Sequence, residues 1–176
     1  MYRRILVGVD GSAPAQRALA AAIDLAARFG SELAILSVQP VRAGAVERLV
    51  RAAVPATREE QALRALLSSA ERQARSAGVP RVETVLLAGD PAEELLSFAR
   101  RRATDVMVVG GRGLSFGTRP SLGSTSRRLV HESLCPVLVV PLIEAGRAAR
   151  RDGGRAAGGS GAPGGARPPR RVPARA

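Results

Sequence analysis

Residues 4–30 read RILVGVDGSAPAQRALAAAIDLAARFG, and this stretch predicts how the fold begins. Its first six residues form a short apolar run, which is typical of a strand buried on both faces. A helix follows, because Ser12 can cap its first turn, Pro14 is tolerated there and Gly30 suits its end. Leucine, isoleucine and alanine recur along one stripe of that helix. The stretch therefore predicts a strand, a tight loop and an amphipathic helix.

The same alternation continues through most of the chain. Four further apolar runs predict strands at residues 32–38, 82–87, 105–109 and 136–143. Thr57 and Asp90, each followed three residues later by a glutamate, form capping boxes that begin two helices. A last helix is predicted over residues 124–133. Since alternating strands and helices imply right-handed crossovers, the predicted fold is α/β: a Rossmann-like open five-stranded parallel sheet, strand order 3-2-1-4-5, with helices on both faces.

The composition changes after residue 143. Residues 144–176 contain eight glycines, four prolines and eight arginines, and Val172 is their only sizeable aliphatic side chain. Such a segment buries too little apolar surface to offset the entropy lost on ordering. We therefore expect one domain over residues 1–143 and a disordered tail over residues 144–176. The tail's arginines, set against two acidic residues, carry half of the net charge of +12.

Several classes of protein are disfavoured by simple counts. The single cysteine, Cys135, cannot form an internal disulfide, which fits a reducing compartment. No segment approaches the roughly 20 apolar residues that span a bilayer, and the start of the chain lacks a signal-peptide pattern. We expect a cytoplasmic protein with no membrane contact. The tail could hold RNA or DNA weakly, but it has no aromatic side chain to stack on bases.

A glycine-rich stretch, VVGGRGLSFGTRPSLGST at residues 108–125, follows the fourth predicted strand. In open parallel sheets, ligands bind beyond the carboxyl ends of the strands where the strand order reverses. The predicted order places this stretch beside residues 8–12, which follow the first strand. A P-loop is excluded because the chain has no lysine, and the glycine spacing does not match a dinucleotide-binding fingerprint.

Another spacing does match. Gly110, Gly113, Gly123 and Ser124 fit the pattern G-x2-G-x9-G-[ST], which resembles the nucleotide-binding signature of the ATP-binding branch of the universal stress protein family. The segments RRILVGVDGS, LAILSV and CPVLVV resemble the family's first, second and last strands. Gly110 and Gly113 would let backbone N–H groups turn toward phosphate oxygens. Gly123, Ser124 and Thr125 lie at a helix start, which favours an anion.

The resemblance implies a site for ATP and Mg²⁺. Asp10 corresponds to the acidic residue expected near the ribose and Mg²⁺, and Gly8 and Val9 would lie along the same wall. Val38 corresponds to a position whose backbone hydrogen-bonds adenine. Val109 corresponds to an apolar position just before the first motif glycine.

Two of these residues have structural alternatives. Asp10 could brace a turn or cap the first helix, and Ser124 could be only the N-cap of the last helix. Arg112 or Arg119 could add positive charge beside the phosphates, although the family pattern requires neither.

The resemblance implies a stress-response regulator or sensor, and efficient hydrolysis is not expected because no lysine and no second carboxylate accompany the motif. The family commonly pairs its last strand between two subunits, which implies a homodimer through residues 136–143. A nucleotide-free scaffold and a nucleic-acid-associated protein that acts through the tail remain open alternatives.

Overall fold

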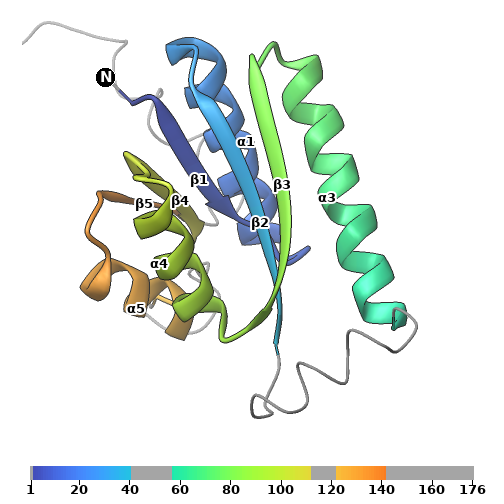
Figure 1. Cartoon of the computed structure of the whole chain (residues 1–176), viewed down its shortest axis with the longest axis vertical. Coiled ribbons are helices and arrows are strands. Elements are labelled where there is room, and N and C mark those ends of the chain that lie inside the picture. The colour runs from blue at the N-terminus through green and yellow to red at the C-terminus, as the bar shows by residue number, and fades with distance from the viewer. Residues whose placement is uncertain (1, 41–56, 112–121, 142–176) are drawn as a thin grey trace, which may run out of the picture. The chain divides into compact units, whose positions relative to one another are not determined.

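The computed structural model describes residues 2–40, 57–111 and 122–141, where strands and helices alternate (Figure 1). The elements are β1 (Arg4–Gly8), α1 (Ala13–Phe29), β2 (Glu32–Pro40), α3 (Arg58–Ser76), β3 (Arg81–Gly89), α4 (Pro91–Arg101), β4 (Val106–Gly110), α5 (Ser124–Glu132) and β5 (Val137–Val140). Gly113, Arg112, Arg119 and the predicted tail lie outside the described residues.

The strands form one parallel sheet in the order β3-β2-β1-β4-β5, which confirms the predicted fold class and strand order. β1 is central: Ile5 pairs with Leu33 of β2 on one side and with Val106 of β4 on the other. The strand order reverses between β1 and β4, so the carboxyl ends of these two strands mark the switch point where ligands bind in such sheets.

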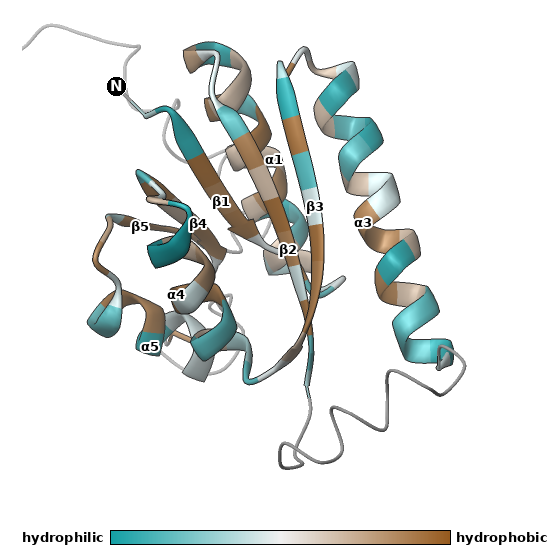
Figure 2. Ribbon diagram, in the orientation of Figure 1, coloured by the Kyte–Doolittle hydropathy of each residue, from teal (hydrophilic) through white to brown (hydrophobic). Residues whose placement is uncertain are grey.

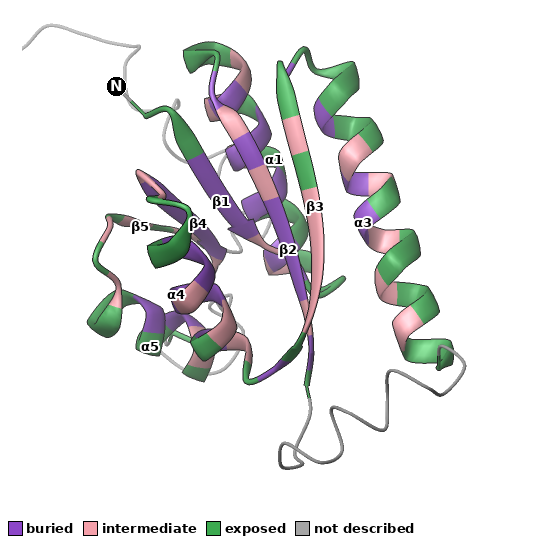
Figure 3. Cartoon of the chain, in the orientation of Figure 1, coloured by how far each residue is buried: buried purple, intermediate pink, exposed green. Residues whose placement is uncertain are grey.

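Two apolar cores cover the two faces of the sheet, because successive side chains of a strand point to opposite faces. Ile5 and Val7 of β1 pack toward α1 and α3, whereas Leu6 packs toward α4 and α5. Figure 3 shows β1, β2 and β4 as largely buried, and Figure 2 shows apolar residues along the same strands. β3 is an edge strand and is less buried.

The helix boundaries follow local capping chemistry. The Ser12 hydroxyl accepts the N–H of Ala15 at 3.3 Å, and α1 ends at Gly30, whose φ of 64° is left-handed. The Thr57 hydroxyl accepts the N–H of Glu60 at 3.2 Å, as the capping box predicts. The carboxylate of Glu60, however, pairs with Arg64 at 2.5 Å. Glu60 therefore forms an i,i+4 ion pair with Arg64 in place of the hydrogen bond to the backbone that would complete the capping box.

Ser124 is not the N-cap of α5, unlike in one of the alternatives that the sequence left open. The N-cap is Gly123, with an extended ψ of 158° and no side-chain hydrogen bond, and Ser124 is the first helical residue. The N-cap residue therefore provides no side-chain acceptor for the first backbone N–H groups of α5. No helix of the described residues is both long and apolar enough to cross a membrane.

Candidate functional site

A cavity of about 340 Å³ lies at the carboxyl edge of the sheet, at the switch point. The ends of β1, β2 and β4 and the first turns of α1, α3 and α5 contribute to its walls. Seven of the residues predicted from the sequence line it: Gly8, Val9, Asp10, Val38, Val109, Gly110 and Thr125. The volume lies in the range of small-molecule sites, which starts near 300 Å³. The fold thus brings together residues separated by more than half of the chain.

Three predicted residues are not among the lining residues. Gly123 and Ser124 lie at the start of α5, one and two positions before Thr125, and Ser124 is exposed. Gly113 lies outside the described residues. At the second half of the glycine motif, the residues that line the cavity are the next two of α5, Thr125 and Ser126.

Asp10 is held by its own loop. One of its carboxylate oxygens accepts the N–H of Ser12 at 2.9 Å, which is an Asx-type turn immediately before the α1 cap. Asp10 thus braces the turn, as one alternative predicted, while also lining the cavity. Gly11, which lies between the two, has a φ of 82°, a value that favours glycine.

Gly110 has a packing role that the motif did not reveal. A Cβ at this position would lie 2.6 Å from the carbonyl carbon of Pro14 and 2.9 Å from the nitrogen of Ala15. Its carbonyl oxygen accepts the hydroxyl of Ser126 at 2.7 Å. The end of β4 is therefore pressed against the first turn of α1 and tied to the first turn of α5.

The cavity has both apolar and polar lining residues. Leu36, Leu95, Val109 and Leu129 give one apolar wall, and all four are buried. The start of α5 faces the same cavity with no acidic residue in its first turn. An apolar slot beside a helix N-terminus can hold a flat ring system that carries an anionic group.

Sequence reasoning missed one charged residue of this cavity. Glu59, in the first turn of α3, lines the cavity. The expectation of no second carboxylate concerned the stretch of the glycine motif, and Glu59 comes instead from a helix far away in the sequence. The presence of Glu59 at the cavity could have been predicted from the topology. Helices of such a sheet begin at its carboxyl edge, and the Thr57 cap marks the first turn of α3.

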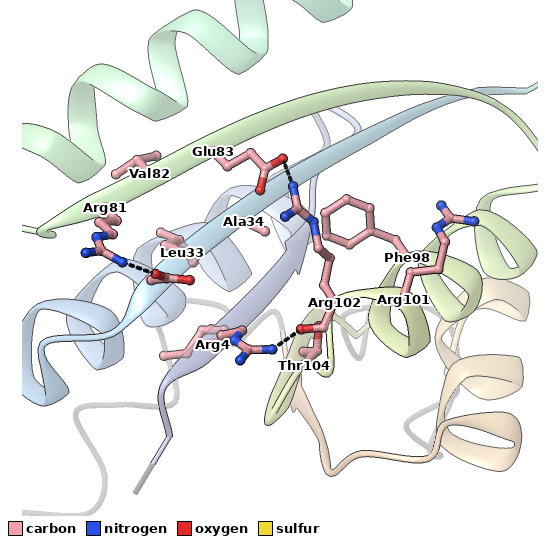
Figure 4. Close-up of a pocket in the computed structure, with 12 residues that line it drawn as sticks. Arg4, Leu33, Ala34, Arg81, Val82, Glu83, Phe98, Arg101, Arg102 and Thr104 are labelled. Carbon is pink, nitrogen blue, oxygen red and sulfur yellow. Dashed lines mark hydrogen bonds and ion pairs between the residues drawn. The ribbon is translucent and has the colours of Figure 1, made fainter.

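A second and larger hollow, of about 570 Å³, lies at the opposite edge, near the amino ends of the strands (Figure 4). Its charged groups satisfy one another. Arg81 and Glu32 pair at 2.6 Å across β2 and β3, Arg102 pairs with Glu83, and Arg4 donates to the carbonyl oxygen of Arg102 at 2.6 Å. Since its polar groups already have partners and it is remote from the glycine motif, we assign the functional site to the carboxyl edge.

Metal ligands are sparse. Within the described ranges, no three His, Cys, Asp or Glu side chains are grouped so that they could hold a metal ion. Any divalent cation at Asp10 would therefore need oxygen ligands from its bound partner or from water.

The comparisons with known proteins agree with this geometry. The model of the universal stress protein family matches residues 1–141. The chain belongs to the universal stress protein family. The universal stress protein YxiE of Bacillus subtilis (strain 168) is 34% identical over 148 residues, a match that covers 80% of this chain and 99% of that relative.

Solved structures of the family share the fold. UspA from Lactobacillus plantarum has a TM-score of 0.67 at 26% identity, with 79% of this universal stress protein and 97% of UspA covered. A universal stress protein crystallised in complex with cAMP has a TM-score of 0.61 at 26% identity, with the same coverage of 79% and 97%. The confirmed resemblance thus extends over residues 1–141, beyond the glycine motif alone.

Proposed function

We propose that this universal stress protein binds an adenine nucleotide, with ATP and Mg²⁺ as its ligands, in the carboxyl-edge cavity. One observation carries the proposal: an apolar slot, the carboxylate of Asp10 and the uncapped start of α5 meet at the switch point of the sheet. The relative crystallised with cAMP supports an adenine nucleotide as the class of ligand.

The cavity offers a suitable group for each part of such a ligand. Val38 and Val109 would border the base, and the carboxylate of Asp10 would face the ribose and Mg²⁺. Gly8 and Val9 would lie along the same wall as Asp10, and the phosphates would lie against Gly110, Gly113, Gly123, Ser124 and Thr125. When bound, Mg²⁺ would neutralise part of the phosphate charge.

We further propose a cytoplasmic stress-response regulator or sensor whose nucleotide state changes dimer or partner contacts. Phosphoryl transfer needs positive charge placed beside the phosphates. Both charged residues among the described lining residues, Asp10 and Glu59, are acidic, which supports binding without efficient hydrolysis. The weak nucleic-acid contact of the tail stays a prediction about residues outside the described part.

Calorimetric titration of the full chain with ATP and Mg²⁺ tests the proposal. We expect saturable binding in the micromolar range and a weakening of about tenfold or more in Asp10→Asn, which loses a charged acceptor. Asparagine keeps an oxygen for the N–H of Ser12, so the turn is retained. Asp24→Asn is the matched control, because Asp24 is an exposed acid of α1 that pairs with Arg28 and does not line the cavity.

Two results would contradict the proposal. If no adenine nucleotide saturates the protein or raises its melting temperature, the fold is a nucleotide-free scaffold. If ATP binds but Asp10→Asn behaves like Asp24→Asn, the assignment of Asp10 is wrong.

A further inference from the structure

The carboxyl-edge cavity has an unusual charge for a phosphate site. The chain contains 27 arginines, yet the only charged side chains among the cavity's described lining residues are Asp10 and Glu59, both acidic. Backbone N–H groups at the start of α5 are the favourable elements for an anion there. A ligand with a large unneutralised negative charge would therefore meet two carboxylates, opposed by the N-termini of the helices whose first turns line the cavity.

Glu59 is held in place by a buried amide. Gln39, at the end of β2, is only 4% exposed. Its side-chain nitrogen donates to the carboxylate of Glu59 at 3.5 Å and to the hydroxyl of Thr57 at 3.4 Å. Both bonds are long, but they come from one buried group that connects the end of β2 to the start of α3. These contacts draw the side chain of Glu59, an exposed residue, toward the end of β2.

The next residue provides an internal contrast. Glu60 is adjacent in sequence and carries the same charge, but it pairs with Arg64 at 2.5 Å along the surface of α3 and does not line the cavity. Two neighbouring carboxylates therefore differ in whether they face a bound ligand.

We infer that Glu59 is a specificity-determining residue, which makes the cavity select adenine ligands by their charge. Its carboxylate disfavours metal-free polyphosphates and leaves uncharged or metal-neutralised ligands little affected. The inference rests on the proposed nucleotide function and adds a selectivity rule to it. The physical basis is Coulomb repulsion between the phosphates and the carboxylate of Glu59, an exposed residue that lines the cavity, and this repulsion is largest in low salt.

Ligand titrations of the full chain in low salt test this inference. The ligands are adenosine, AMP, ATP with a chelator and ATP with excess Mg²⁺, and the variants are Glu59→Gln and Glu60→Gln. We expect Glu59→Gln to tighten the binding of metal-free ATP by about five- to tenfold. The gain should be smaller for AMP and for ATP with Mg²⁺, and absent for adenosine. Glu60→Gln should match the wild type for every ligand.

Salt gives an independent readout. The gain in Glu59→Gln should shrink as the ionic strength rises, because screening weakens the repulsion that the substitution removes. A gain that arose from altered packing would keep its size in salt and would contradict the inference.

The remaining outcomes separate this inference from the proposed function. If adenine ligands bind but Glu59→Gln and Glu60→Gln are alike with metal-free ATP, Glu59 does not set selectivity and the nucleotide function stands. If Glu59→Gln weakens ATP binding in Mg²⁺, Glu59 favours the bound complex, and the inference is overturned. If the wild type binds none of the four ligands, the proposed function fails and the inference fails with it.

Discussion

Gly110 illustrates how a single residue can serve the fold and the site together. The pattern that contains it points to backbone contact with phosphate, but the structure gives a separate reason for glycine. Any side chain would enter the backbone of α1 at Pro14 and Ala15. Gly8, which ends the neighbouring strand β1, is less constrained, because a Cβ there would meet only the tip of the Leu95 side chain at 3.2 Å.

Gly110 and Gly8 should differ in how much an added methyl group destabilises the protein without nucleotide. We expect Gly110→Ala to lower the free energy of unfolding by about 2–3 kcal/mol, since backbone must move to admit the methyl group. Gly8→Ala should cost less, because a flexible side chain can yield. Urea denaturation of both variants measures the difference. Equal losses would show that the contact with α1 does not require glycine.

At the scale of elements, helix starts build the site and Asp105 anchors the other end of the sheet. Asp105 immediately precedes β4, and its carboxylate accepts the N–H groups of Arg4 at 2.9 Å and Arg3 at 2.7 Å. These two backbone hydrogen bonds, of which the one from Arg4 has the larger effect, lower the pKa of Asp105 below its ordinary value. The carboxylate thus ties the amino ends of β1 and β4 more strongly while it is ionised.

This anchor predicts a pH dependence of stability. A lowered pKa in the folded protein gives a stabilisation that is complete above the ordinary pKa and lost as the pH falls through the lowered value. We expect the wild type to lose stability below about pH 4 more steeply than Asp105→Asn, whose amide does not titrate. Urea denaturation between neutral and acid pH measures both slopes. Parallel curves for the two proteins would contradict the role of Asp105.

At the scale of the whole molecule, the β5 edge of the sheet bears on assembly. β5 is an edge strand, Leu138 on it is 41% exposed, and Leu134 just before it is 85% exposed. An exposed apolar edge strand invites pairing with another chain. This geometry supports the proposed homodimer through β5, whose isologous contact would repeat the same patch on both subunits.

Sedimentation velocity tests this assembly. We expect the wild type to sediment as a dimer at micromolar concentration and Leu138→Glu to shift toward the monomer, since it places like charges across the paired edge. Phe29→Glu serves as the control, because Phe29 is 39% exposed but ends α1 on a different element. A monomeric wild type, or a dimer that Leu138→Glu leaves intact, would rule out the β5 interface.

Much of this protein could be predicted from its sequence. The alternation of strands and the helix caps at Ser12, Thr57 and Asp90 depend on neighbouring residues. The strand order follows from general rules of chain connection. All of these could therefore be predicted from the sequence. The sequence motifs also located seven of the eighteen described residues that line the cavity. The limits of β1 to β4 differ from the predicted ones by at most two residues, as with β2, which continues through Pro40. β5 ends at Val140, and residues 142 and 143 of the predicted last strand lie outside the described residues.

Tertiary structure alone decided which distant atoms meet. The sequence shows Glu59 and Glu60 as equivalent first-turn acids, and only the packing of α3 against β2 directs one toward the cavity and leaves the other with Arg64. It shows Gly110 as a motif glycine, and only the crossing of β4 with α1 reveals the steric demand. Local sequence determines secondary structure through short-range bonds, whereas the charge and shape of a site arise from contacts between segments far apart in the chain.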